Sequence, residues 1–139
     1  NNVLEVVVKE LHWGSALPDS TLFDTVFATD VLYDIGSWLP LLQTVVMSLP
    51  PEGFFLLSHV PRAAMPSGES CSLEEYLTAT AKAEGLDLIK IVRPGEIRNT
   101  ARKMNEEMEQ KGVALFIFQR SDSRAQILKF RLDIGVQLQ

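Results

Sequence analysis

The 139-residue sequence has a single cysteine, Cys71, and only two histidines, His12 and His59. A chain with one thiol cannot form an internal disulfide, as is typical of intracellular proteins, so we expect a cytoplasmic location, with the nucleus as the alternative. We interpret Cys71 as a small residue before a helix and not as a catalytic thiol. Because neither histidine lies in a Cys/His spacing that suggests zinc, we expect no metal site.

Long apolar runs, an N-terminal signal and an excess of positive charge are missing as well. No apolar run is long enough to span a bilayer, and the first residues, Asn-Asn-Val-Leu-Glu, have neither the basic nor the hydrophobic region of a signal peptide. The net charge of −5 gives no attraction to nucleic acid or to an anionic membrane, so we expect neither as a partner. The chain lacks an initial Met and reaches strand-like sequence almost at once, and we therefore expect a fragment.

Several familiar catalytic and ligand-binding motifs are also absent from the sequence, among them the P-loop, the EF-hand loop and G-x-G-x-x-G. Ser58 and His59 end an apolar run, but no G-x-S-x-G elbow and no acidic partner accompany them, so we expect no hydrolase triad. His59 is either a residue of a substrate cleft or, as we prefer, a surface turn residue. What remains is a chain with 46% hydrophobic and 22% charged residues, the composition of one globular domain.

Apolar patterning predicts a single α/β domain over residues 1–139. Runs rich in β-branched and aromatic residues predict strands, and apolar residues at 3-4 spacing predict helices, one after an N-cap at Ser37 and one after a capping box at Ser72. The strands are expected at Val3–Leu11, Phe23–Thr29, Phe54–Val60, Leu86–Val92 and Val113–Gln119, and the helices at Trp38–Leu49, Ser72–Glu84 and Ile97–Met108.

The order of these elements predicts a parallel, doubly wound sheet. The run Phe23–Thr29 is almost continuously apolar, which is typical of a strand covered on both faces. Together with the next helix and strand it should form a βαβ unit with a right-handed crossover. Residues 120–139 are expected as a C-terminal extension with an extra amphipathic strand, since apolar and polar residues alternate between Leu128 and Val136.

Two strand ends carry residues suited to ligand binding, because open parallel sheets bind ligands beyond the carboxyl ends of their strands. Trp13 follows the first predicted strand and can stack its indole on a flat heterocycle. Asp30 and Tyr33 follow the second, in the stretch FATDVLYD, where a carboxylate can hold an ammonium group and a ring can line a slot. Each has a structural alternative: Trp13 as an aromatic at the edge of the core, Asp30 as a loop cap, and Tyr33 as a surface residue.

The stretches ELHWG, FDTVFATDVLYD and GFFLLSHVPR, with the helix LPLLQTV between the last two, resemble the distal part of seven-β-strand methyltransferases. More narrowly, they resemble the non-SET protein lysine methyltransferases that share a D-x-x-Y motif. The resemblance runs from about Asn2 to Gln119 and is strongest over residues 9–62. It implies a Rossmann-like class I sheet with flanking helices, S-adenosylmethionine as the cofactor, and a protein substrate methylated on nitrogen, most often on lysine.

The same resemblance implies roles for four residues. Asp30 and Tyr33 match the D-x-x-Y pair, which in the family holds the target amine near the methyl sulfonium. Trp13 matches a tryptophan that borders the cofactor, and Thr29 matches a small residue, usually alanine, whose backbone lies by the cofactor. These roles suit methyl transfer, an in-line displacement that depends mainly on proximity and orientation.

The family's glycine-rich first motif and the acidic residue that holds the ribose precede the L-x-W-G strand, and neither is present in this chain. In the family's strand order, 3-2-1-4-5-7-6, strands one and two would then be missing and Val3–Leu11 would have no neighbour. Three solutions stay open: a fragment, a homo-oligomer or partner chain that completes the sheet, or a strand that pairs elsewhere. We expect the chain alone to be inactive. The alternatives to an enzyme are an inactive methyltransferase-like binding or scaffolding module and an unrelated α/β fold.

Overall fold

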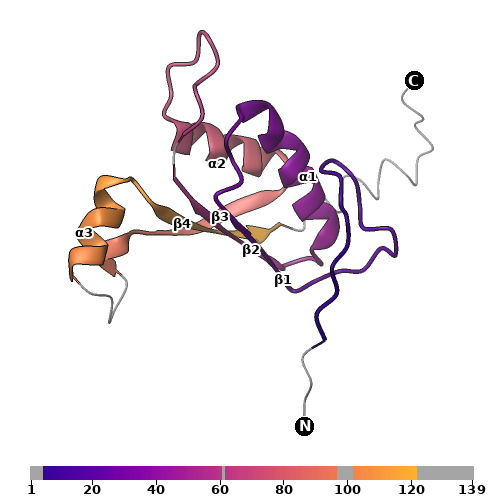
Figure 1. Ribbon diagram of the computed structural model, residues 1–139. Coiled ribbons are helices and arrows are strands. Elements are labelled where there is room, and N and C mark those ends of the chain that lie inside the picture. Colours follow the sequence, from indigo (N-terminus) through magenta and orange to yellow (C-terminus); the bar gives the residue numbers. More distant parts are fainter. Residues whose placement is uncertain (1–4, 61, 97–101, 122–139) are drawn as a thin grey trace.

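The computed structural model describes residues 5–60, 62–96 and 102–121, which form a mixed α/β fold with one four-stranded sheet and flanking helices (Figure 1). The elements are β1 (Thr25–Thr29), a 3-10 turn (Ile35–Ser37), α1 (Trp38–Ser48), β2 (Phe54–His59), α2 (Leu73–Ala83), β3 (Leu86–Val92), a 3-10 turn (Pro94–Glu96), α3 (Arg102–Gln110) and β4 (Ala114–Arg120). The predicted strands at 23–29, 54–60, 86–92 and 113–119 and the three predicted helices are confirmed to within a few residues, although residues 97–101 of the third helix lie outside the described ranges. In the described part of the chain, no helix is long and apolar enough to cross a membrane.

The strands are arranged in the order β1-β2-β4-β3. β1 and β2 are parallel and joined through α1, which confirms the predicted βαβ unit, and the order agrees with the last four positions, 4-5-7-6, of the family's order. The expectation of an entirely parallel sheet is wrong, because β4 is antiparallel to both of its neighbours. The reason is that β3 and β4 are joined at one end of the sheet by α3, so the chain returns beside β3 without crossing the sheet.

The first predicted strand, Val3–Leu11, is wrong over its described part, because Glu5–Leu11 has no regular secondary structure. Val6, Val7 and Val8 are 84%, 62% and 91% exposed. A strand requires a neighbour that pairs with its N–H and C=O groups, and no strand of the described sheet lies beside this segment. The extra amphipathic strand predicted at 128–136 lies outside the described residues.

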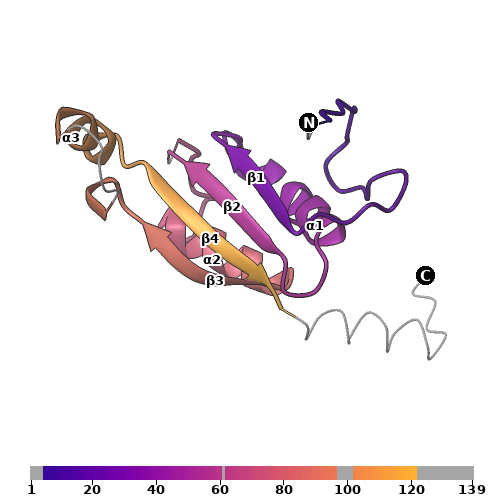
Figure 2. The same ribbon diagram turned by 90° about the horizontal axis from the view of Figure 1, so that it is seen from below.

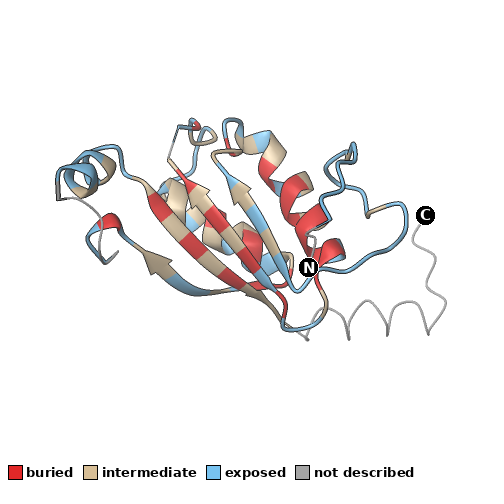
Figure 3. Cartoon of the chain, turned by 60° about the horizontal axis from the view of Figure 1, so that its bottom comes forward, coloured by how far each residue is buried: buried red, intermediate tan, exposed pale blue. Residues whose placement is uncertain are grey.

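Both α1 and α2 lie on the same face of the sheet, and the views in Figures 1 and 2 agree on this. A doubly wound sheet, which we expected, has helices on both of its faces. In the described part of the chain, α1 and α2 cover one face only. The prediction that β1 is covered on both faces is wrong: Val26 and Ala28 pack against the core, whereas Phe27, on the open face, is 72% exposed. Figure 3 shows this face, with alternating buried and less buried positions along β2 and β4.

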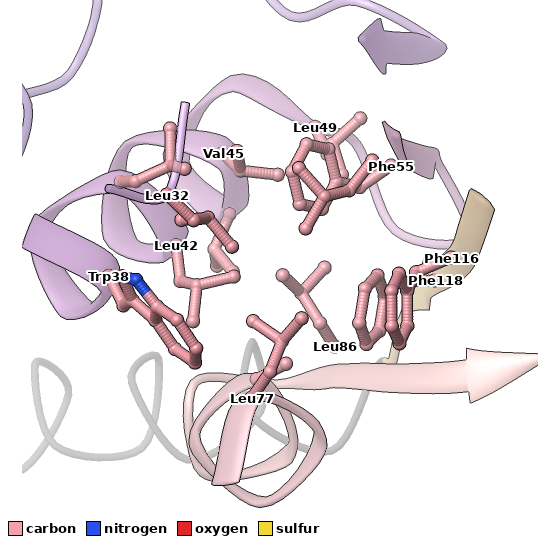
Figure 4. Close-up of a cluster of buried hydrophobic side chains, with 14 of the residues drawn as sticks. Leu32, Trp38, Leu42, Val45, Leu49, Phe55, Leu77, Leu86, Phe116 and Phe118 are labelled. Atoms are coloured by element: carbon pink, nitrogen blue, oxygen red, sulfur yellow. The ribbon is translucent and has the colours of Figure 1, made fainter. Parts of the chain in front are cut away.

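The core lies between the sheet and these two helices (Figure 4). Phe55 of β2 and Phe118 of β4 stand opposite each other in the antiparallel register, and their rings stack with centroids 5.9 Å apart. The 3-4 spacing of apolar residues in α1 places Leu42 and Val45 in the same cluster, both at most 2% exposed. The helical stripe and the alternation in the strands thus meet in one cluster.

The capping predictions have different outcomes at the two helices. At α2, Ser72 Oγ accepts from the Glu75 N–H at 3.2 Å and the Glu75 carboxylate accepts from the Ser72 N–H at 2.7 Å, so the predicted capping box is confirmed. At α1, the Ser37 side chain makes no cap bond, and its hydroxyl donates instead to the Asp34 carbonyl at 2.6 Å. The 3-10 turn before α1 gives Ser37 a helical conformation, whereas a capping residue normally has an extended one.

The outer edge of β1 faces no other strand in the described sheet. The Asp24 carbonyl accepts from Phe54 N–H at 2.9 Å and the Asp30 N–H donates to the Ser58 carbonyl at 2.9 Å. Because residues of a parallel strand bond to a given neighbour in alternation, the N–H and C=O groups of the odd-numbered residues Thr25, Phe27 and Thr29 point to this open edge.

Replacing Phe118 by alanine should lower the free energy of unfolding by about 3–5 kcal/mol, the cost of removing a buried aromatic ring and leaving a cavity. The matched change Phe27→Ala should cost less than about 1 kcal/mol, because this ring is mostly exposed. Urea unfolding followed by circular dichroism measures both values. Equal losses for the two variants would contradict the assignment of the two sheet faces.

Amide hydrogen exchange should separate neighbouring residues of β1. The N–H of Phe27, at the open edge, should exchange at least about tenfold faster than that of Ala28, which points to β2. Nuclear magnetic resonance measures the two rates in one sample. Equal protection of Phe27 and Ala28 would show that another polypeptide segment covers the edge.

Candidate functional site

The parallel register brings the carboxyl ends of β1 and β2 side by side. Asp30 follows β1 directly, and its N–H donates to the carbonyl of Ser58 in β2 at 2.9 Å. His59 is the last residue of β2, and Arg62 follows three residues later. The candidate site therefore contains groups from two segments that are about thirty residues apart in sequence.

Asp30 has an unusual backbone conformation, with φ of +50°. Positive φ is uncommon for a residue with a Cβ atom, and aspartate is among the few that tolerate it. Residues held in such conformations cluster at functional sites, where the surrounding structure fixes them. Here the hydrogen bond to Ser58 fixes the backbone, so the direction in which the Asp30 side chain leaves the sheet is determined.

The carboxylate of Asp30 pairs with the guanidinium of Arg62. Nη2 of Arg62 lies 2.7 Å from Oδ2 of Asp30, and the two side chains are 52% and 46% exposed. This contact was not predicted from the sequence. The only signal that could have indicated it is the order of the strands, since residues just beyond two neighbouring parallel strands meet at the same edge of a sheet.

His59 lies beneath this edge and is buried, with 3% of its surface exposed, so the preferred prediction of a surface turn residue is wrong. Its ring packs edge-on against Trp38 with centroids 6.0 Å apart. Neither ring nitrogen has a hydrogen-bond partner among the described residues. Burial lowers the pKa of His59 below its ordinary value of 6.5, while the charge of Asp30 acts to raise the pKa and that of Arg62 to lower it.

Trp13 and Thr29 line the same cavity, which has a volume of about 420 Å³ and lies between β1, α1 and the loop before β1. Trp13 is 40% exposed, so its ring is accessible. The loop that carries it is held on α1, because the N–H of Gly14 donates to Thr44 Oγ1 at 2.7 Å. Gly14 has φ of +93°, which a side chain at this position would strain. The structure thus brings together the two residues that the resemblance assigns to the cofactor.

Two side-chain hydroxyls of this cavity are already engaged. Thr44 Oγ1 donates to the Ser15 carbonyl at 3.3 Å, and Ser48 Oγ donates to the Thr44 carbonyl at 2.8 Å. No aspartate or glutamate of the described residues lines the cavity. Its apolar walls and the Trp13 ring fit a flat heterocycle, and its volume falls within the range of ligand pockets. It offers no carboxylate for the hydroxyls of a ribose.

Tyr33 is 63% exposed and lies on the surface, three residues beyond Asp30. It does not line the cavity that contains Trp13 and Thr29, and neither does Asp30. Asp30 follows Thr29 directly in the sequence, but its side chain is not part of the cavity wall and pairs with Arg62 instead. Of the four predicted site residues, the structure brings Trp13 and Thr29 together in the cavity, while Asp30 and Tyr33 lie outside its lining.

Comparison with known proteins finds no matching family model and no matching curated protein. Solved structures do match, at 14% sequence identity in each of the three cases below. A Listeria monocytogenes protein described as an S-adenosylmethionine-dependent methyltransferase has a TM-score of 0.51, over 71% of this chain and 62% of that chain. The [4+2]-cyclase SpnF has a TM-score of 0.52, over 81% and 55%. A Galdieria sulphuraria protein described as a sarcosine dimethylglycine methyltransferase has a TM-score of 0.47, over 73% and 54%.

At this level of identity the likeness establishes the fold alone. The chain has the α/β fold of the Listeria protein and of SpnF, whose descriptions name two different reactions. It spans between about half and three fifths of the length of the structures it matches. The choice of reaction must therefore come from the residues of the site.

The free energy of unfolding should decrease as the pH is lowered, because of His59. Its pKa is lowered by folding, so the unfolded chain takes up a proton at higher pH than the folded protein does. The stability contribution of the neutral imidazole is complete above about pH 6.5 and is lost as the pH falls from there toward the lower pKa of the folded state. Urea unfolding should therefore give a smaller free energy of unfolding at about pH 5.5 than at about pH 7.

The variant His59→Phe removes the titrating group and should make this decrease smaller. The control His12→Phe changes the other histidine, which is exposed, and should leave the decrease as it is. A decrease that is the same in the wild-type protein and in both variants would show that His59 is not its source.

Proposed function

We propose that this chain carries the amine-binding edge of an S-adenosylmethionine-dependent protein N-methyltransferase that acts on lysine. One observation supports this most directly: Trp13 and Thr29 line one cavity, and Asp30, which follows Thr29 in the sequence, is held with a positive φ. The α/β fold shared with a protein described as an S-adenosylmethionine-dependent methyltransferase is consistent with the proposal.

Trp13 and Thr29 would hold the cofactor on the heterocycle side. The exposed indole can stack on an adenine ring, and the backbone at Thr29, the last residue of β1, can approach the bound molecule. When bound, the cofactor supplies an electrophilic methyl group on a sulfonium. The ribose must be held by groups other than those that line the cavity, since no carboxylate of the described residues is among them.

Asp30 would hold the target. A lysine approaches as an ammonium ion, and its N–H groups can donate to the Asp30 carboxylate, which fixes the nitrogen beside the cavity. Attack on the methyl group needs the lone pair of the neutral amine, so the ammonium would first give a proton to solvent. The bond from nitrogen to the methyl carbon would then form as the bond from carbon to sulfur breaks, with the cofactor leaving as a neutral thioether. Catalysis then depends on holding the nitrogen in line with the bond to the methyl group, which is worth several kcal/mol. Tyr33 can stabilise a methylated, cationic nitrogen through the face of its ring.

A methyltransferase-like module that binds without catalysis is the second candidate. The observation that favours it is the cavity itself, which has apolar walls and no acidic residue from the described part of the chain. Such a module would bind the cofactor weakly or not at all and would still present Asp30 and Tyr33 to a basic segment of a partner protein.

The proposal is tested by cofactor binding and by methyl transfer, measured on the natural protein with this chain in parallel. Titration calorimetry with S-adenosylmethionine should show binding to the natural protein that Trp13→Ala weakens by about tenfold, the loss of one stacking interaction of about 1–3 kcal/mol. Radiolabelled methyl transfer to lysine-containing peptides should fall by at least about a hundredfold in Asp30→Asn, because the nitrogen is no longer held in line.

Asparagine tolerates positive φ, so Asp30→Asn removes the charge and keeps the backbone. The matched control is Asp34→Asn, an exposed aspartate four residues away, which should keep full activity. Undiminished transfer by Asp30→Asn would contradict the role of Asp30. Binding of the cofactor without any transfer would favour the module, and absence of binding by the natural protein would exclude the enzyme.

A further inference from the structure

We propose that Arg62 is an internal occupant of the cation site at Asp30, and that a basic substrate side chain binds by displacing it. The inference rests on the proposed function in one respect, the assignment of Asp30 as the group that holds the target amine. It adds a specificity-determining residue that no sequence motif indicated.

The contact of Arg62 with Asp30 has the chemistry of the interaction that a substrate would make. Nη2 lies 2.7 Å from Oδ2, the distance of a charge-assisted hydrogen bond. A lysine ammonium or an arginine guanidinium presents the same kind of donor to the same oxygen. The carboxylate therefore already holds a cation supplied by the chain itself.

The two partners differ in how firmly they are held. Asp30 is anchored by its N–H bond to Ser58 and by its position directly after β1. Arg62 lies beyond the end of β2, in the irregular segment that precedes α2, and its long side chain is 52% exposed. An exchange of cations at this site would therefore move Arg62 and leave Asp30 in place.

The displacement is energetically easy, because an exposed ion pair contributes little. Pairs of this kind are worth about 0.2–1 kcal/mol, which corresponds to a factor of about 1.4 to 5 in an equilibrium constant. Arg62 would lower the apparent affinity for a competing cation by that factor without closing the site. No second described cation has an ion pair with Asp30, and His59 beside it is buried with its pKa lowered, so it does not replace Arg62 in this role.

The test is a titration with n-butylammonium chloride, a probe with the ammonium group of lysine and no other charge. Nuclear magnetic resonance follows the amide signal of Asp30 in the full chain, without cofactor. Arg62→Gln should bind the probe more tightly than the wild type by a factor of about 1.4 to 5. Arg62→Lys keeps a cation at the site and should stay close to the wild type.

The matched control is Arg93→Gln. Arg93 is also about half exposed and pairs with a carboxylate, that of Glu74, at 2.8 and 3.0 Å, and this pair includes neither Asp30 nor Arg62. Its replacement should leave the affinity for the probe unchanged. In an Asp30→Asn background, Arg62→Gln should have no effect, because the site for which both cations compete has been removed.

An affinity in Arg62→Gln that equals or falls below that of the wild type would overturn the proposal, as would the absence of a probe-induced shift at Asp30 in every variant. Because the titration uses no cofactor, its result is independent of methyl transfer. A tighter complex in Arg62→Gln together with no transfer by the natural protein would refute the methyltransferase and retain the cation site. The reverse result would refute the role of Arg62 alone.

Discussion

The parallel pairing of β1 with β2 is the constraint on which both the core and the candidate site depend. Two parallel neighbours need a crossover, and the crossover here is α1, whose apolar stripe supplies one wall of the core. The same pairing puts both carboxyl ends at one edge of the sheet. Asp30 and Arg62 meet there, although the sequence separates them by 32 residues. A change of register by one residue would move Val26 and Ala28 out of the core and Asp30 away from its partner.

The core is least well satisfied directly beneath this edge. The indole N–H of Trp38 and both ring nitrogens of His59 are buried without a hydrogen-bond partner among the described residues. An unsatisfied buried polar group costs about 1–3 kcal/mol, and the packing of a fully buried indole offsets part of that cost. Such departures from optimal stability are expected where function and not folding selects the residues. Two of the three described side chains with such atoms, Trp38 and His59, contact each other next to the end of β2, and the third, Asn105, lies in α3.

Local sequence patterns predicted most of the elements, because each of these elements has its own signal. Ser72 and Glu75 form a capping box whose spacing alone specifies the start of α2, and the 3-4 spacing in α1 specifies its buried face. The predictions that were wrong concern which segments contact one another, and not which residues favour a strand or a helix. Val6, Val7 and Val8 have the composition of a strand but no neighbour with which to pair, and β1 has an apolar sequence but no cover on one face. The adjacency of β1 and β2 was predicted, but the Asp30–Arg62 contact was not, since it also depends on the path of the irregular segment that carries Arg62.

The cavity beside Trp13 and the open edge of β1 adjoin each other, and their chemical requirements differ. A flat heterocycle can fill an apolar cavity, but it cannot pair with the alternating donors and acceptors of Thr25, Phe27 and Thr29 along the edge. Another strand can pair with these groups. A partner chain that completes the sheet in this way stays a prediction. If such a strand ran parallel to β1, its carboxyl end would lie beside Thr29 and Asp30, where open sheets bind ligands. A carboxylate on that strand could then reach a ribose that the described cavity walls cannot hold. The choice between an enzyme and a binding module thus depends on what pairs with β1.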